Sequence, residues 1–329
     1  MKPTRIISVL KQLLNQRWPA FLWGPPGIGK SSVVKSVALA ADLPVIDLRA
    51  SLLDPTDLRG IPTIQNGEAV WCPPSFLPGA TDRPGILFLD EINAAPPLVQ
   101  ASLYQLVLDR QIGEYRLPDG WSIVAAGNRQ TDRAVVFRLS SALANRFIHL
   151  DFESDVDDWR TWAIAAGINP LVVGFIATRP ELLSGIPGDA VAYPTPRSWE
   201  MISDVVRAHS DDIDSCWDVI PGIVGEAAAI EFQGYASRAI REEDLRKLVS
   251  SPKTAPIPES MSDIFAMTSW FAYHSKEKEV RTAGAVLLSR IPPEFAVILA
   301  RDLLKASPTL VTEPGYKDFM KKHGKLLLG

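Results

Sequence analysis

A glycine-rich loop constrains this chain more than any other part of its sequence. It reads Gly24-Pro25-Pro26-Gly27-Ile28-Gly29-Lys30-Ser31. Glycines at this spacing let backbone N–H groups turn inward and approach an anion without a clash from a Cβ atom. A short apolar run, Ala20–Trp23, precedes the loop, and Ser31–Ala41 has the composition of a helix. Because the positive end of that helix dipole would face the loop, the pattern predicts a phosphate-binding site.

Each part of the loop has an expected contact with a nucleotide. The ammonium group of Lys30 should reach the β- and γ-phosphates of ATP, and the Ser31 hydroxyl should ligate Mg²⁺. We expect cofactor contacts from the loop and the residue after it, namely Gly24, Pro25, Pro26, Gly27, Ile28, Gly29, Lys30, Ser31 and Ser32. A structural glycine turn is the alternative, and the flanking strand and helix signals disfavour it.

Two carboxylates follow the apolar run Ile86–Leu89, which is typical of a buried strand. Ligands of open α/β sheets bind at the carboxyl ends of the strands, where Asp90 and Glu91 would emerge. Asp90 is expected to hold Mg²⁺ through water, and Glu91 to polarise the attacking water as a general base. The alternative is that the pair only caps the next helix.

A third polar group follows another strand signal. Asn128 comes two residues after the apolar run Ser122–Ala126. If that strand lies beside the one ending at Asp90, the Asn128 side chain could hydrogen-bond the γ-phosphate or the lytic water. An asparagine that merely shapes a turn is the alternative.

Residues 1–152 alternate apolar runs with helical patterns, which predicts a parallel sheet with helices on both faces. The strands are expected at Ala20–Trp23, Val45–Asp47, Ile86–Asp90, Ser122–Ala126 and Ile148–Phe152. Two hairpins would interrupt this α/β core. One spans Thr63–Cys72 around Asn66-Gly67, and the other spans Arg110–Trp121, with a turn near Pro118–Gly120 that leads into the Ser122–Ala126 strand.

Strand signals fade after residue 152, and helical patterns take over. Residues 153–250 are expected to form an all-α lid, with helices at Trp159–Ala166, Leu171–Thr178, Trp199–His209, Ile213–Ile220, Gly222–Gly234 and Glu242–Ser250. Residues 251–329 are expected to form a C-terminal helical extension. Its helices would lie at Met261–His274, Lys276–Ser289 and Pro293–Lys305, followed by a basic, loosely held tail at Lys317–Leu328.

Composition narrows the setting in which the chain works. A net charge of −4 disfavours a surface built to neutralise nucleic-acid phosphates. The two cysteines, Cys72 and Cys216, lack any metal-binding spacing and are typical of a reducing compartment. No stretch approaches the roughly 18 apolar residues that a membrane span needs. We therefore expect a soluble, cytoplasmic protein without a membrane span, for which nucleic acid is a disfavoured partner.

These elements, in this order and spacing, resemble the AAA+ ATPases, and in detail their MoxR and dynein-related branch. The Gly24–Ser31 loop is similar to the family's Walker A motif, Ile86–Glu91 to Walker B, and Asn128 to sensor 1. The two expected hairpins stand where this branch has its insertions. The resemblance covers roughly residues 15–235 and implies the AAA+ αβα core of a P-loop NTPase, ATP and Mg²⁺ as cofactors, and ATP hydrolysis.

Arginines complete the site in this family. Ser140–Phe147 is similar to the family segment that ends in an Arg-Phe pair, which implies that Arg146 is the arginine finger for ATP on a neighbouring subunit. Arg129, Arg133 and Arg138 are the rival candidates. Thr195–Ser198 resembles the sensor 2 motif, which implies that Arg197 links the lid to the γ-phosphate.

The resemblance also implies a way of working. A finger that acts on a neighbour requires a ring, and the family implies a homo-hexamer that remodels or matures a protein client, in the manner of a chaperone. A protein with a von Willebrand A domain is the first partner to expect. The alternatives are a nucleic-acid-directed motor of the helicase or loader type, and a P-loop nucleotide switch or kinase that forms no ring.

Overall fold

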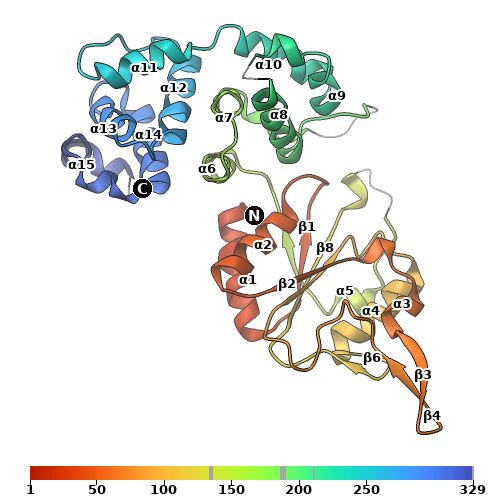
Figure 1. The fold of residues 1–329 in the computed structure, drawn as a ribbon. Coiled ribbons are helices and arrows are strands. Elements are labelled where there is room, and N and C mark those ends of the chain that lie inside the picture. Colours follow the sequence, from red (N-terminus) through yellow and green to blue (C-terminus); the bar gives the residue numbers. More distant parts are fainter. Residues whose placement is uncertain (133–135, 186–189, 210–211, 328–329) are drawn as a thin grey trace. The chain divides into compact units, whose positions relative to one another are not determined.

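The structure is a computed structural model that describes residues 1–132, 136–185, 190–209 and 212–327 of the chain. The chain divides into two compact units, Met1–Ser154 and Asp155–Gly329. The first unit is built on a parallel sheet and the second is helical (Figure 1). The boundary lies close to residue 152, where the expected α/β core ends. The finer division of the helical unit at residue 250 stays a prediction.

The first unit contains a five-stranded parallel sheet in the order β2-β5-β8-β1-β9. Its strands are β1 (Ala20–Trp23), β2 (Val45–Arg49), β5 (Ile86–Asp90), β8 (Ser122–Gly127) and β9 (Ile148–Asp151). All five strands that the sequence predicts are present, with ends that differ by at most a few residues. This order puts β1, β5 and β8 in the interior of the sheet, so the loops that follow them meet at one edge.

Helices cover both faces of this sheet, because side chains alternate along each strand. On one face Leu22 and Phe88 pack against α1 (Pro3–Gln16) and α2 (Lys30–Ala40). On the other face Phe21, Leu87 and Leu89 pack with α4 (Pro97–Asp109). The short helices of the unit are η1 (Ala50–Leu52), α3 (Pro55–Arg59), η2 (Gln130–Asp132) and α5 (Ser141–Ala144).

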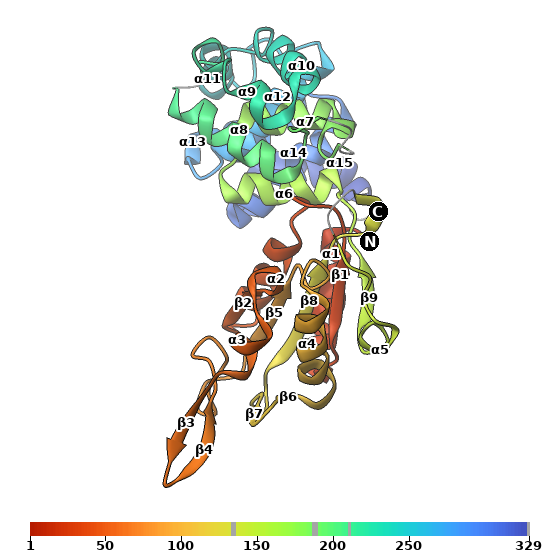
Figure 2. The ribbon, with the colours of Figure 1, turned by 90° about the vertical axis from the view of Figure 1, so that its right-hand side faces the viewer.

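Both expected hairpins exist. The first pairs β3 (Ile61–Gln65) with β4 (Glu68–Cys72), and it projects from the sheet in both views (Figures 1 and 2). The second pairs β6 (Gln111–Ile112) with β7 (Tyr115–Arg116), and its chain reversal lies at Gly113, whose φ is +56°. Pro118–Gly120 forms the expected turn into β8, where Trp121 N–H donates to the Pro118 carbonyl.

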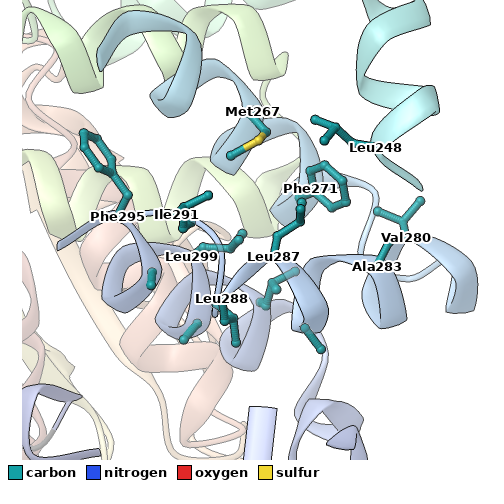
Figure 3. Close-up of a cluster of buried hydrophobic side chains, with 14 of the residues drawn as sticks. Leu248, Met267, Phe271, Val280, Ala283, Leu287, Leu288, Ile291, Phe295 and Leu299 are labelled. Atoms are coloured by element: carbon teal, nitrogen blue, oxygen red, sulfur yellow. The ribbon is translucent and has the colours of Figure 1, made fainter. Parts of the chain in front are cut away.

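The second unit consists of helices. They are α6 (Val156–Ala166), α7 (Pro170–Thr178), η3 (Pro180–Leu182), α8 (Pro196–Ala208), η4 (Asp214–Cys216), α9 (Ile220–Val224), α10 (Glu226–Ala236), α11 (Glu242–Ser250), α12 (Met261–Tyr273), α13 (Lys278–Leu287), α14 (Pro293–Ala306), η5 (Pro308–Thr312) and α15 (Pro314–Leu327). One apolar cluster in this unit contains side chains from the helices α11, α12, α13, α14 and α15. Figure 3 shows part of it, with Met267 and Phe271 of α12 facing Leu287 and Leu299.

Two expectations for the helical unit were wrong. The helix expected at Ile213–Ile220 is only the short turn η4, and α9 begins where that helix should end. Gly225, with φ of +82°, then separates α9 from α10, because a left-handed residue breaks the helical hydrogen-bond ladder. The basic tail is not loose: Tyr316 and Phe319 anchor α15 in the core, while Lys317, Lys321 and Lys322 are exposed.

A buried ion pair links two helices of this unit. The Arg160 guanidinium on α6 donates to the Asp302 carboxylate on α14 at 3.0 Å, and both side chains are at most 2% exposed. On the surface nearby, Arg301 of α14 donates to Asp157 of α6. These ion pairs connect two helices that are far apart in the sequence, and α14 packs in the same compact unit as α6.

Candidate active site

The glycine-rich loop lies between β1 and α2, as the sequence predicts. Gly27 and Gly29 have φ of +74° and +104°, a conformation that residues with a Cβ atom rarely adopt. At Gly24 a Cβ atom would lie 3.0 Å from the Phe152 carbonyl oxygen, so the close approach of β9 also requires glycine. Ile28 points into the core, whereas Ser32 is exposed on α2. The loop backbone is therefore free to face an anion.

Lys30 is buried at the start of α2, and neutral oxygens surround its ammonium group. Its Nζ donates to the Gly24 carbonyl at 2.6 Å, the Pro25 carbonyl at 3.0 Å and the Asn128 Oδ1 at 2.8 Å. Two of these acceptors belong to the loop itself and the third lies on the neighbouring strand end. The strand that ends before Asn128 lies beside β5, and the fold thereby brings Asn128 to Lys30.

Ser31 and Asp90 form a pair of oxygen ligands beside the loop. Ser31 Oγ donates to Asp90 Oδ2 at 3.1 Å, and the Glu91 backbone N–H donates to Asp90 Oδ1 at 3.0 Å. Burial raises the pKa of the Asp90 carboxyl, and the Ser31 and Glu91 hydrogen bonds only partly offset this effect. A hydroxyl and a carboxylate fit Mg²⁺, which prefers hard oxygen ligands and keeps several waters. A bound cation would also relieve the cost of the buried charge.

Glu91 sits in a strained turn directly after β5. Its φ is +54°, a left-handed conformation that costs a non-glycine residue roughly 1–2 kcal/mol. Two backbone hydrogen bonds hold the turn, from Ile92 N–H to the Ala126 carbonyl and from Ala94 N–H to the Glu91 carbonyl. The exposed carboxylate accepts a 2.7 Å hydrogen bond from Ser51 Oγ. The turn thus presents the Glu91 carboxylate to solvent at the sheet edge, where Ser51 orients it.

Asn93 is a site residue that sequence reasoning missed. Its side chain is 3% exposed and holds the backbone of Asn128 on both sides. Asn93 Nδ2 donates to the Asn128 carbonyl at 2.6 Å, and Asn128 N–H donates to Asn93 Oδ1 at 3.3 Å. Gly127 must lack a side chain here, because a Cβ atom would lie 2.3 Å from Asn93 Oδ1. The only signal in the sequence was one polar residue within the apolar run Ile92–Ala95.

We expect replacement of Asn93 by alanine to lower the turnover number for ATP roughly tenfold, because a small displacement of reacting groups is costly. The change removes the hydrogen bonds that orient Asn128, while the phosphate loop stays intact. Nucleotide affinity should therefore stay within about threefold of its original value. Steady-state hydrolysis and fluorescent-nucleotide titration measure the two quantities.

Asn15→Ala is the control for this variant, since Asn15 is exposed on α1. It should change neither quantity. An Asn93→Ala protein that folds normally and turns over ATP at the original rate would contradict the role given to Asn93.

The candidates for the arginine finger differ in whether a carboxylate already pairs with the guanidinium group. Arg146 is exposed after α5, on the wall of an open hollow that α5 and the following residues line. Arg129 forms an ion pair with Asp151 and lies over the Trp23 ring. Within residues 1–132 and 136–154, no carboxylate pairs with Arg146 or with the exposed Arg138. Arg133 lies outside the described residues.

Arg197 belongs to the helical unit. It is exposed in the first turn of α8, where Thr195 caps the helix and exchanges hydrogen bonds with Ser198. The helix start that the sequence motif predicts is therefore present. The contact of Arg197 with nucleotide stays a prediction, since all the contacts described above lie within the α/β unit.

The parallel sheet and the glycine-rich loop define a P-loop nucleotide-binding domain. Residues 19–147 match the family described as the AAA domain (dynein-related subfamily). This part of the chain is an AAA domain of the AAA+ class, and the protein is an ATPase. The family resemblance on the Walker A, Walker B and sensor 1 motifs is thereby confirmed.

The comparison with solved structures finds weak similarities. NtrX from Brucella abortus in complex with ADP is 13% identical, with a TM-score of 0.41 over 98% of this chain and 68% of that chain. A RuvB variant from Thermotoga maritima is 16% identical, with a TM-score of 0.37 over 98% of this chain and 87% of that chain. No curated protein matches the chain in sequence. Within the residues that the structure describes, no helix is long and apolar enough to cross a membrane.

Proposed function

We propose that this protein is a MoxR-type AAA+ ATPase that assembles into a ring and couples hydrolysis of ATP with Mg²⁺ to remodelling of a protein client. The observation that carries this proposal is the meeting of Lys30, Ser31, Asp90, Glu91 and Asn128 at one edge of the sheet. These side chains come from the ends of the neighbouring strands β5 and β8 and from the first turn of α2. Their arrangement supports hydrolysis and not only binding, because an exposed carboxylate adjoins the phosphate loop.

The residues of the site divide the chemistry among themselves. The loop N–H groups and Lys30 bind the phosphates, and Lys30 exchanges its loop carbonyls for phosphate oxygens. Ser31 and Asp90 hold Mg²⁺, which when bound would neutralise charge on the phosphates. Glu91 accepts a proton from the attacking water, and Asn128 orients that water or the γ-phosphate. Ser51 must release the Glu91 carboxylate, or share it, when the water binds.

The ring is the next step of the proposal. Arg146 lines an open hollow, and no carboxylate among the described residues of its unit pairs with it. Its charge is therefore available to another chain. A guanidinium that reaches a neighbour's γ-phosphate would stabilise charge in the transition state. Arg129 is less suited, because it is already engaged with Asp151. The hexamer and the sensor 2 role of Arg197 rest on the family resemblance.

A protein is the proposed client, and a partner with a von Willebrand A domain is the first candidate. The net charge of −4 supports a protein client over a nucleic acid. A nucleic-acid-directed motor is the alternative, and stimulation of ATP hydrolysis by DNA or RNA would favour it. A P-loop switch or kinase that forms no ring is the other alternative.

Mixed rings test the ring and the role of Arg146 together. Arg146→Ala subunits keep their own site but offer no finger, whereas Glu91→Gln subunits offer a finger but do not hydrolyse. We expect each variant alone to be nearly inactive, with losses of about 10³-fold or more for the missing arginine. Mixing should restore hydrolysis at the sites of the Arg146→Ala subunits. The measurement is ATP hydrolysis across a series of mixing ratios.

Arg138→Ala is the matched control, because Arg138 is another exposed candidate for the arginine finger and has no described carboxylate partner. It should retain activity without mixing. If the Arg146→Ala subunits stay inactive at every ratio although mixed rings form, the trans role of Arg146 is wrong. Activity of a monomer that lacks Arg146 would support the switch or kinase instead.

A further inference from the structure

A histidine on the edge strand β9 connects the phosphate loop to the segment that carries Arg146. Trp23, the last residue of β1, donates from its indole Nε1 to His149 Nδ1 at 2.8 Å. The other ring nitrogen of His149, Nε2, lies 2.8 Å from the Ala144 carbonyl oxygen. Trp23 directly precedes Gly24, and Ala144 is the last residue of α5. Figure 2 shows α5 beside β9 at the edge of the sheet.

The partners of His149 determine its protonation state. An indole N–H can only donate, so Nδ1 of His149 must carry a lone pair. A backbone carbonyl can only accept, so Nε2 must carry the proton. Both hydrogen bonds form only in this neutral tautomer. The charged groups around this pair are Arg129, which lies over the Trp23 ring, and Asp151, which pairs with Arg129 and leaves that charge compensated.

His149 contacts a short segment that further contacts hold in place. Leu143 and Phe147 are buried on either side of Arg146 and hold the segment against the core. The Arg146 N–H donates to the Leu143 carbonyl and the Phe147 N–H to the Ala144 carbonyl. The Ala144 carbonyl therefore accepts from both His149 and the residue that follows Arg146. A shift of this carbonyl would redirect the guanidinium at the hollow.

We propose that His149 is a positioning residue that sets the direction of Arg146 and links it to the phosphate loop of the same subunit. The inference rests on the proposed function of Arg146. Its consequence is that the state of one nucleotide site influences the arginine that this subunit offers to the next site. His149 touches neither nucleotide nor the reacting atoms, and acts through Ala144 and Trp23.

Two variants separate the hydrogen bonds of His149 from its bulk. His149→Phe keeps the ring among Phe21 and Trp23 but loses both hydrogen bonds, and we expect the turnover number to fall about tenfold. His149→Gln keeps one acceptor and one donor, and it should stay within about threefold of the original turnover number. Nucleotide affinity should not change in either variant. Equal losses in both variants would overturn the role of the hydrogen bonds.

Mixing with Glu91→Gln subunits separates this inference from the proposed function. A His149→Phe subunit has an intact site of its own, so a neighbour's correctly directed Arg146 should restore its hydrolysis. A defect in its own phosphate loop would not be restored. If Arg146→Ala subunits are restored but His149→Phe subunits are not, the His149 inference fails alone. If Arg146→Ala subunits are not restored either, the proposed function fails and the inference falls with it.

The tautomer of His149 provides a test that needs no activity assay. Nitrogen-15 NMR of the four histidines in the full chain, with His149 assigned through His149→Gln, reports which ring nitrogen carries the proton. We expect the tautomer with the proton on Nε2. A proton on Nδ1 would exclude the hydrogen bond from Trp23 and overturn the inference.

Discussion

Replacement of Glu91 by glutamine should leave the protein able to bind ATP while its turnover number falls at least about 100-fold, the usual effect of losing a general base. Glutamine has the shape of glutamate but cannot accept a proton from water. The left-handed turn at Glu91 is held by backbone hydrogen bonds from Ile92 and Ala94, which the change does not touch. The phosphate loop and Asp90 should therefore still bind the nucleotide.

Single-turnover hydrolysis and nucleotide titration measure the two parts of this prediction. Glu259→Gln is the matched control, since Glu259 is exposed in the helical unit, and it should retain full activity. Bound ATP that is hydrolysed at the original rate by Glu91→Gln would exclude Glu91 as the base. Size-exclusion chromatography with ATP would also show whether the trapped state favours the ring.

Removal of one member of the buried ion pair should have the largest effect on stability. Asp302→Ala leaves the Arg160 guanidinium buried without its partner, and loss of one partner from a buried pair typically costs about 3–5 kcal/mol. Burial raises the pKa of Asp302 and lowers that of Arg160, so desolvation outweighs the attraction between them. We expect a large loss in the free energy of unfolding of the helical unit, measured by denaturant titration.

Simultaneous replacement of Arg160 and Asp302 is expected to leave the free energy of unfolding nearly unchanged. Arg160→Met with Asp302→Leu removes both charges and fills the space with apolar atoms, which often leaves stability unchanged or higher. The double variant should therefore be far more stable than Asp302→Ala. Asp204→Ala is the control, because its ion pair with Arg207 is exposed and should be worth at most about 1 kcal/mol. A mild effect of Asp302→Ala, equal to this control, would contradict the expected cost of an unpaired buried charge.

The sheet and the phosphate loop could be predicted from the sequence because their signals are local. Apolar runs such as Ile86–Leu89 are recognisable as buried strands, and the spacing from Gly24 to Ser31 needs no knowledge of distant residues. The turn at Pro118–Gly120 that leads into β8 was predicted for the same local reason, because its composition is typical of a turn. The chain reversal at Gly113 was not predicted, because pairing of β6 with β7 fixes it.

The residues that orient the site could not be predicted in the same way. Ser51, Asn93 and His149 do not belong to any of the motifs that the sequence shows. Their roles arise where the ends of separate strands come within hydrogen-bond distance. The basic tail shows the same limit, since its charges suggested a free end while Phe319 holds it in the core.

The sequence alone determined that this protein has a parallel α/β nucleotide-binding core followed by helices, because hydrophobic period and glycine spacing are properties of neighbouring residues. It also predicts which side chains contact the phosphates. Only the tertiary structure decided how those side chains are held: that Lys30 contacts Asn128, that Asn93 clamps Asn128, and that His149 joins Trp23 to the Arg146 segment. The physical reason is that hydrogen bonds between distant residues depend on strand order and register, which the packing of the whole core sets.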